Sequence, residues 1–448
     1  MRFWEVPAVP TALTIAALLL AASFVRRSIP FLRRLGIPDS MVAGFVALLL
    51  GASALNLLPL DLQTLEIVVY QGLAVIFIAV GLQEPIKTKG GGGAKSVAFA
   101  LPVFASLQTL IGLSLALALQ VHPGFGSLLP LGFQQGPGQA LSLGEAWESS
   151  GLVDGGQIGL IIAAVGFAWA VFVGVPLVAV GRRLGWTQGG ETDGSEEENL
   201  VRPATAEPGG LEPFTSQLAI VGVLLLVTWG IVRGVSGVLP EKMAPMAYGF
   251  HFIVGLGLAM LTRTVLKKMG RQQAVLHDGL LGRIGGLAVD GVTCSALAAV
   301  QIGVLAANWV PIAVITGAGG LLSALGLVWL ARRAWRDAPF EHAMVVFGAL
   351  TGTLPTGLAL LRMVDPNLRG PAASSAVVGS AAAAPLIAPL VIAVIPLPVG
   401  SWPSYSGTLI AMGLCAVYVV GLLVAWRFAG PLRFLGPLHS LWPDPEPE

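Results

Sequence analysis

Residues 134–140 read Gln134-Gln135-Gly136-Pro137-Gly138-Gln139-Ala140, and residues 351–357 read Thr351-Gly352-Thr353-Leu354-Pro355-Thr356-Gly357. Each stretch interrupts an apolar segment, 125–147 in the first case and 340–364 in the second. Inside a membrane, a backbone that leaves helical geometry exposes amide and carbonyl groups that are costly when unpaired. The two stretches therefore predict breaks at which protein, water or a ligand satisfies the backbone.

The composition around these breaks is that of a membrane protein. Of the 448 residues, 55% are hydrophobic and 11% are charged, whereas a soluble domain carries about 25% charged residues. The formal net charge of +1 argues against a nucleic-acid-binding surface, which needs a clustered basic excess. Cys294 and Cys415 lie within apolar runs and the five histidines lack ligand-type spacing, so we expect no disulfide, no cofactor and no resident metal site.

Eleven apolar runs are long enough to cross the hydrocarbon core, a distance that takes about 20 residues in a helix. They lie near residues 9–25, 38–58, 65–83, 97–121, 155–181, 215–236, 244–266, 280–305, 309–331, 372–396 and 406–428. The two interrupted segments are too broken to be further ordinary spans.

The basic residues indicate how these runs cross the membrane. With the N-terminus outside, 22 of the 25 Lys and Arg residues fall in cytoplasmic loops, and only Arg2, Arg233 and Lys242 fall outside. This split holds only if both interrupted segments enter and leave the membrane on the same side. We therefore predict two re-entrant hairpins in a multi-pass protein of the plasma (inner) membrane, with a cytoplasmic C-terminus.

The two halves of the chain share short motifs at matching positions. Ile37-Pro38-Asp39-Ser40-Met41 recurs as Leu239-Pro240-Glu241-Lys242-Met243, and Gly72-Leu73-Ala74-Val75 recurs as Gly286-Leu287-Ala288-Val289. Each half therefore reads as four helices, a hairpin and a fifth helix. Because five is an odd number, the second half must be inserted upside down relative to the first, as in many secondary transporters.

The predicted fold class is an all-α polytopic membrane protein: an inverted repeat of two five-helix units, each with a re-entrant hairpin, plus one extra C-terminal helix. The first repeat covers residues 1–181 and the second covers 214–396, with a cytoplasmic linker at 182–213 between them. Residues 397–448 form the extra span and a cytoplasmic tail. Broken helices at matching positions of such a repeat indicate a binding site near the membrane midplane.

The two breaks supply neutral groups that suit a small anion and a coupling ion. Half-helix N-termini attract carboxylates, whereas free carbonyl groups hold Na⁺. The candidate substrate-binding residues are Gln134, Gln135, Gly136, Gly138 and Gln139 at the first break, and Thr351, Gly352, Thr353, Pro355 and Thr356 at the second. The alternative is that these residues only cap the hairpins.

Three further residues are candidates because ionisable groups within a membrane are costly and are functional candidates by default. Asp290, with its neighbour Thr293, lies inside the eighth run and is a candidate for binding Na⁺ or carrying a proton. A structural pairing of Asp290 with Arg283 is the alternative. Arg362 follows the second break by six residues, where its guanidinium suits a carboxylate; the alternative is an interfacial anchor.

The chain resembles the bacterial sodium:glutamate symporters over roughly residues 10–396. The resemblance is strongest in Ile37-Pro38 with Val42-Ala43-Gly44, in Gly136-Pro137-Gly138, and in Gly352 with Pro355-Thr356. It implies inverted five-helix repeats with two re-entrant hairpins, a homodimer, and an elevator-type movement. Glutamate as substrate and sodium as coupling ion are likewise implied by this resemblance.

The chain departs from that family at both breaks. The family's first break usually reads Gly-Gly-His-Gly-Thr, and Gln135-Gly136-Pro137-Gly138-Gln139 stands there in this chain. At the second break Leu354 replaces the first Thr of the family's Thr-Pro-Thr, and Leu360 and Arg362 occupy its Asn and Gln positions. Several substrate contacts have therefore changed.

These features favour an ion-coupled secondary transporter, a sodium symporter for glutamate or a related small organic anion. The alternative within this class is a proton-coupled carrier of another carboxylate. An intramembrane enzyme would need a nucleophile with a base, paired aspartates or a metal cluster, and the sequence offers no such constellation. A channel would show pore-lining rings or filter repeats, whereas inverted hairpins favour a carrier. We therefore expect a lipid-embedded carrier that is not an enzyme.

Overall fold

The computed structural model describes residues 6–29, 37–84, 92–188, 211–240, 244–366, 368, 370–430 and 432. In these residues the regular secondary structure is helical, and nine helices are long and apolar enough to cross a membrane. The prediction of an all-α polytopic membrane protein is thus confirmed. Seven of the nine are α1 (Ala8–Ser28), α4 (Leu62–Leu82), α5 (Gly92–Ala118), α10 (Pro213–Val238), α14 (Asp278–Ala298), α16 (Trp309–Ala334) and α21 (Ser406–Ala429).

The other two long helices contain a wider turn in the middle. In the first, α8 (Gly155–Trp169), η3 (Ala170–Gly174) and α9 (Val175–Arg183) run on as one rod. In the second, α19 (Pro371–Pro389) continues through η4 (Leu390–Val394) to α20 (Leu397–Gly400). The residues labelled η are π-helical turns, which absorb one extra residue without ending the helix.

Two of the eleven predicted spans differ from the expected continuous helix. The run at 38–58 forms α3 (Asp39–Leu50), whose 12 residues rise only about 18 Å. The run at 244–266 is broken at Phe250 into α11 (Ala244–Gly249) and α12 (His251–Lys268). The hydrophobicity of these two runs predicted membrane segments, but it did not reveal where the chain leaves helical geometry.

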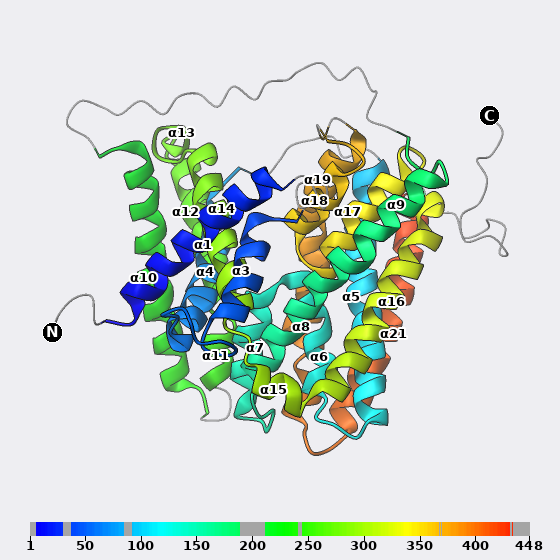
Figure 1. The fold of residues 1–448 in the computed structure, drawn as a ribbon, viewed down its shortest axis with the longest axis horizontal. Helices are drawn as coiled ribbons and strands as arrows, with labels where there is room; N and C mark the ends of the chain where they lie inside the picture. Colours follow the sequence, from blue (N-terminus) through cyan, green and yellow to red (C-terminus); the bar gives the residue numbers. More distant parts are fainter. Residues whose placement is uncertain are drawn as a thin grey trace.

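The helices form two groups that lie side by side in Figure 1. We call the first the α4 bundle, which comprises α1, α3, α4, α10, α11, α12 and α14. The second, the α5 bundle, comprises α5, the rods of α8 and α19, α16 and α21, and the two broken helix pairs described below. Short helices α13 (Gln272–Val275) and α15 (Ile302–Ala307) lie at opposite ends of the molecule.

The α4 bundle is built from elements far apart in the sequence. Helix α4 packs against both α12 and α14, and α14 also packs against α3. A methyl group built on Gly72 of α4 would lie 2.4 Å from Val292 Cγ2 of α14. The absence of a side chain at Gly72 therefore lets the two helices approach closely.

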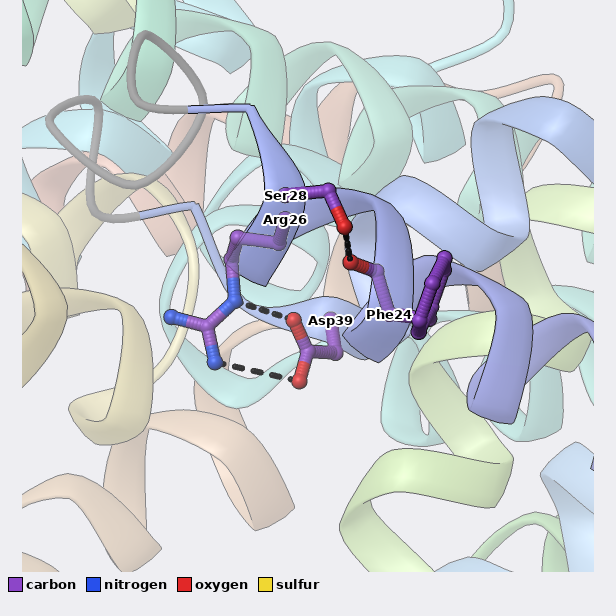
Figure 2. A network of polar contacts seen from close by, with 4 residues as sticks. All are labelled: Phe24, Arg26, Ser28 and Asp39. Carbon is purple, nitrogen blue, oxygen red and sulfur yellow. Dashed lines mark hydrogen bonds and ion pairs between the residues drawn. The ribbon is translucent and has the colours of Figure 1, made fainter.

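Basic side chains gather at one end of the molecule, which we call the basic end. They occupy the last turns of α1, α9, α12, α16 and α21. At this end Arg26 of α1 donates both Nε and Nη2 to the Asp39 carboxylate, the Nη2–Oδ2 distance being 3.1 Å (Figure 2). Because Asp39 lies in the first turn of α3, its charge also faces the positive end of that helix.

Candidate functional site

The first broken pair is a hairpin that opens at the end opposite the basic end. It consists of α6 (Gly124–Pro130), η2 (Leu131–Gln135) and α7 (Pro137–Glu148), with the reversal at Gly136. Gly136 has φ +86°, which is a conformation that other L-residues rarely adopt. Helix α7 then runs antiparallel to α8. Two contacts show this, since Gly144 lies against Gly155 and Ala140 lies against Gly159.

The second broken pair opens at the basic end. It consists of α17 (Pro339–Thr351) and α18 (Leu354–Arg362), joined through Gly352 and Thr353. A methyl group built on Gly357 would lie 2.1 Å from Val345 O, so the two arms are antiparallel and in close contact. The two broken pairs therefore enter the molecule from opposite ends.

The tips of the two hairpins meet inside the α5 bundle. A methyl group built on Gly136 would lie 3.1 Å from Cγ2 of Thr353, which belongs to the opposite tip. Helix α8 lies against both tips, since Gly166 contacts Phe133 of one hairpin and Thr351 O of the other. The structure thus brings together the two stretches that the sequence analysis selected.

Three glutamines of the first tip form short polar contacts. The Gln134 amide lies beside α5, where one orientation donates to Leu101 O (3.2 Å) and accepts from Ala105 N (2.9 Å). Gln139 donates to Gln135 Oε1 at 3.3 Å. The Gln139 side chain is buried, and its own Oε1 has no hydrogen-bond partner. Gln139 therefore offers an unused acceptor beside the tip.

The second tip supplies hydroxyl groups. Thr353 and Thr356 lie with their Oγ1 atoms 3.4 Å apart, and Gly352 lies against the Thr356 side chain. Thr351 is fully buried and donates to Phe347 O at 2.9 Å, so its hydroxyl is occupied within the helix. Pro355 is exposed at the start of α18.

Two helices begin at the meeting point and point their N-termini towards it. Helix α7 begins at Pro137 and α18 begins at Leu354. The first turns of a helix carry unpaired amide groups and a partial positive charge, which together favour an anion. Since the predicted tip residues are all neutral, these helix ends are the positive groups that the tips themselves present.

Gln108 is a residue of this region that the sequence analysis missed. It is fully buried in α5 and donates to Ser323 Oγ (3.0 Å) of α16 and to Leu350 O (3.2 Å) of α17. Gln108 therefore joins α5 to α16 and to the second hairpin. A glutamine in the middle of the apolar run 97–121 is the feature of the sequence that could have identified it.

Three predicted residues do not lie with the tips. Arg362 is exposed at the C-terminal end of α18, eight residues or about 12 Å along the helix from Leu354. Asp290 and Thr293 lie on α14 of the α4 bundle, where Asp290 is exposed and Thr293 is buried. Asp290 and Arg283 lie on the same side of α14, but no hydrogen bond or ion pair joins these two described residues.

Gly138 contacts the other bundle rather than the opposite tip. A methyl group built on it would lie 2.9 Å from Leu73 Cβ of α4. Among the described residues, no group of three His, Cys, Asp or Glu side chains is placed to hold a metal ion. Any ion at the tips would therefore be bound by main-chain and neutral side-chain oxygens.

Comparison with known proteins gives one match. The family model described as sodium/glutamate symporter matches residues 5–328, which is well over half of the chain. This range includes the first hairpin and ends before the second begins at Pro339. No curated protein matches the sequence.

Proposed function

Because the chain belongs to the sodium/glutamate symporter family and is therefore a multi-pass membrane transporter rather than an enzyme, we propose that it couples Na⁺ movement to the transport of glutamate or a related small organic anion. The anion binds where the two hairpin tips meet. The observation that carries this proposal is the convergence of the N-termini of α7 and α18 on one point inside the α5 bundle. A carboxylate at that point gains amide donors and two helix dipoles.

The neutral side chains of the tips complete the proposed site. The unpartnered Gln139 Oε1 accepts from the ammonium group of an amino acid, and the Thr353 and Thr356 hydroxyls bind carboxylate oxygens. Carbonyl groups at the two breaks hold the coupling Na⁺. We assign Gln134 to orienting the tip through α5, because its amide is engaged by that helix.

The mechanism proposed for this site is an elevator-type movement of the α5 bundle past the α4 bundle within a homodimer. Two inverted repeats, residues 1–181 and 214–396, are joined by the linker 182–213, with 397–448 as the appended part. In support, α3 packs on α14 just as α12 packs on α4. This exchange of partners is the packing that a two-fold related pair of repeats requires.

Three candidate residues lie outside the proposed site at the tips: Asp290, Thr293 and Arg362. Asp290 and Thr293 of the α4 bundle are the proposed binding site of the coupling ion. An exposed carboxylate on a long apolar helix costs free energy, which favours a functional role for it. For Arg362, position at the exposed end of α18 supports the role of an interfacial anchor. Arg362→Gln separates the two roles: anion affinity falls if the guanidinium meets a carboxylate and is unchanged if it is an anchor.

Uptake into proteoliposomes tests the proposal. Labelled glutamate, aspartate and simple dicarboxylates are offered with an inward Na⁺ gradient, an inward proton gradient, or neither. We expect saturable uptake that needs the Na⁺ gradient, and a requirement for the proton gradient instead would identify the proton-coupled alternative. Flux that neither gradient drives would contradict symport, and a steady current without saturable uptake would indicate a channel.

A further inference from the structure

A cavity that contains two acidic side chains lies away from the hairpin tips, between α4, α10, α11 and α12. Its volume is about 510 Å³, and its lining includes Glu66 and Tyr70 of α4, Trp229 of α10, Tyr248 of α11, and Glu145 of α7. A neighbouring cavity of about 410 Å³ shares Tyr70, Tyr248 and Glu145 with it. We call the two together the acidic cavity. A volume of this size is typical of a site for a small organic molecule.

Two acidic side chains line the acidic cavity. Glu66 and Glu145 line it, and the described residues that line it include no Lys or Arg. Glu66 accepts one hydrogen bond through Oε1, from Gln157 Nε2 at 2.7 Å, which leaves its other oxygen for a ligand. Two carboxylates without a cation of the chain between them favour a positively charged occupant.

The remaining walls are aromatic rings. Tyr70 stacks on His251 with ring centroids 3.9 Å apart, and its hydroxyl donates to Tyr248 O at 2.7 Å. Both ring nitrogens of His251 lie at hydrogen-bond distance from carbonyl oxygens, Tyr248 O at 2.8 Å and Tyr70 O at 3.0 Å. A neutral imidazole carries one N–H and therefore donates to one of these two oxygens. The Arg233 guanidinium lies 5.4 Å from the Trp229 ring, so this ring already attracts a cation at the rim.

One buried polar group in the acidic cavity has no partner. Ser142 of α7 is 1% exposed, its Oγ makes no hydrogen bond, and the residue lines the cavity beside Glu145. Burial of an unpaired hydroxyl is unfavourable, and a ligand amine or hydroxyl would supply the missing hydrogen bond. This observation is independent of the carboxylates and points to the same occupant.

We propose that the acidic cavity binds an organic ammonium ion. The described residues contain no group of three acidic, His or Cys side chains able to hold a metal ion, so a bare divalent ion does not suit it. An organic ammonium ion meets Glu66 and Glu145 through charge-assisted hydrogen bonds and the ring of Tyr70 through a cation–π contact. Because α7 belongs to the α5 bundle and α4 to the other, the bound ion joins the two bundles.

Calorimetric titration of the full-length protein in phosphatidylglycerol nanodiscs tests this site. The probe is benzylammonium, and benzyl alcohol is its uncharged counterpart. We expect saturable binding of benzylammonium alone, weakened about tenfold by Glu66→Gln and by Glu145→Gln. Ser142→Ala, which leaves both carboxylates in place, also weakens binding. None of these readouts depends on transport, so the result is independent of the proposed function.

Asp154→Asn is the matched control, because Asp154 lies just before α8 at the same end of the molecule, makes no side-chain cap hydrogen bond, and does not line the cavity. Its affinity should equal that of the wild type. Equal binding of benzyl alcohol, or unchanged affinity in folded Glu66→Gln and Glu145→Gln proteins, would overturn the proposal. A repeat with phosphatidylethanolamine in the nanodisc identifies the natural source: displacement of the probe assigns the lipid headgroup, and unchanged binding assigns a soluble amine.

Discussion

Gly136 and Gly138 have different tasks although only Pro137 separates them. Gly136 reverses the chain through a left-handed backbone conformation, and its lack of a side chain admits the opposite tip at Thr353. Gly138 has ordinary helical geometry and contacts Leu73 of α4 instead. One glycine therefore shapes the proposed binding site, and the other sets the distance between the two bundles.

The first prediction concerns Gly138. In Gly138→Leu, the new side chain overlaps Leu73, where even a Cβ atom would lie 2.9 Å from the Leu73 Cβ. We expect uptake into proteoliposomes to be lost while the protein still inserts into the membrane. Gly413→Leu on α21 is the matched control, since no heavy atom lies within 4 Å of a Cβ built there. Wild-type uptake by Gly138→Leu would show that this contact does not limit transport.

Asp290 carries the second prediction. If its carboxylate serves the coupling ion, Asp290→Asn removes the charge and uptake loses its dependence on the Na⁺ gradient, with membrane levels unchanged. Initial rates at several Na⁺ concentrations measure this. Asp154→Asn, at the loop before α8, is the control. Unchanged Na⁺ dependence in Asp290→Asn would make the residue structural, and loss of the protein itself would show that the carboxylate is needed for folding or insertion.

At the scale of elements, the hairpins depend on residues outside them that hold their arms. Ala338 precedes α17 in a left-handed conformation, φ +44°, and its N–H donates to Gln188 Oε1 at 2.8 Å. In return the Gln188 N–H donates to Glu341 Oε1 at 2.8 Å. The segment after α9 thus caps the start of the second hairpin, in the manner of a capping box formed between distant segments.

The first hairpin is held in a comparable way by His122, and this gives a pH prediction. His122 Nδ1 accepts from Gly124 N at 3.0 Å, and the ring lies 4.9 Å from that of Trp402. Burial lowers the pKa of His122 below its usual 6.5, although a backbone hydrogen bond at Ser150 acts in the opposite direction. Protonation of Nδ1 would remove the bond to Gly124.

Because the pKa is lower in the folded state, the unfolded state binds the proton more tightly. The contribution of His122 to stability is complete above pH 6.5 and is lost as the pH falls through the folded-state pKa. We expect the melting temperature to fall between pH 7.5 and pH 5, and to fall less in His122→Asn. His277→Asn, at the basic end, is the matched control, and its melting temperature should fall as much as that of the wild type. An equal fall in wild type and His122→Asn would assign the effect to other groups.

At the scale of the whole molecule, the difference between the basic end and the opposite end predicts how the protein is oriented in the membrane. The rod from α8 to α9 runs between them, from Asp154 to Arg183. The positive-inside rule predicts that the basic end lies in the cytoplasm. Gly194 and Glu446, which the predicted topology also places there, lie outside the described residues.

Two single cysteines on this rod test the orientation. Val153 is 75% exposed at one end and Leu184 is 58% exposed at the other. In a background without Cys294 and Cys415, an impermeant thiol reagent added to intact cells should label Val153→Cys and not Leu184→Cys. Permeabilised cells supply the control, in which both are labelled. Labelling of Leu184→Cys in intact cells would reverse the topology.

The sequence by itself determined the membrane class, the nine long helices of the described residues, and the two breaks. These follow from local properties: about 20 apolar residues span a bilayer, and Gly and Pro residues close together in an apolar run weaken the helix there. The positions of α3 and of the break at Phe250 were less accessible, because apolar composition does not reveal where an apolar run leaves helical geometry.

Only the tertiary structure decided which distant groups meet. Gly136 touches Thr353 across more than 200 residues, Gln108 joins α16 and α17, and Arg362 lies away from the tips although it follows them closely in sequence. The acidic cavity likewise needs Glu66 and Glu145 on helices of different bundles. The hydrophobic pattern and the helix-breaking residues act over a few neighbouring positions. Contacts between distant helices depend instead on how closely the helices pack, which is set by the shapes of the side chains at their interfaces. The sequence does not show which helices share an interface.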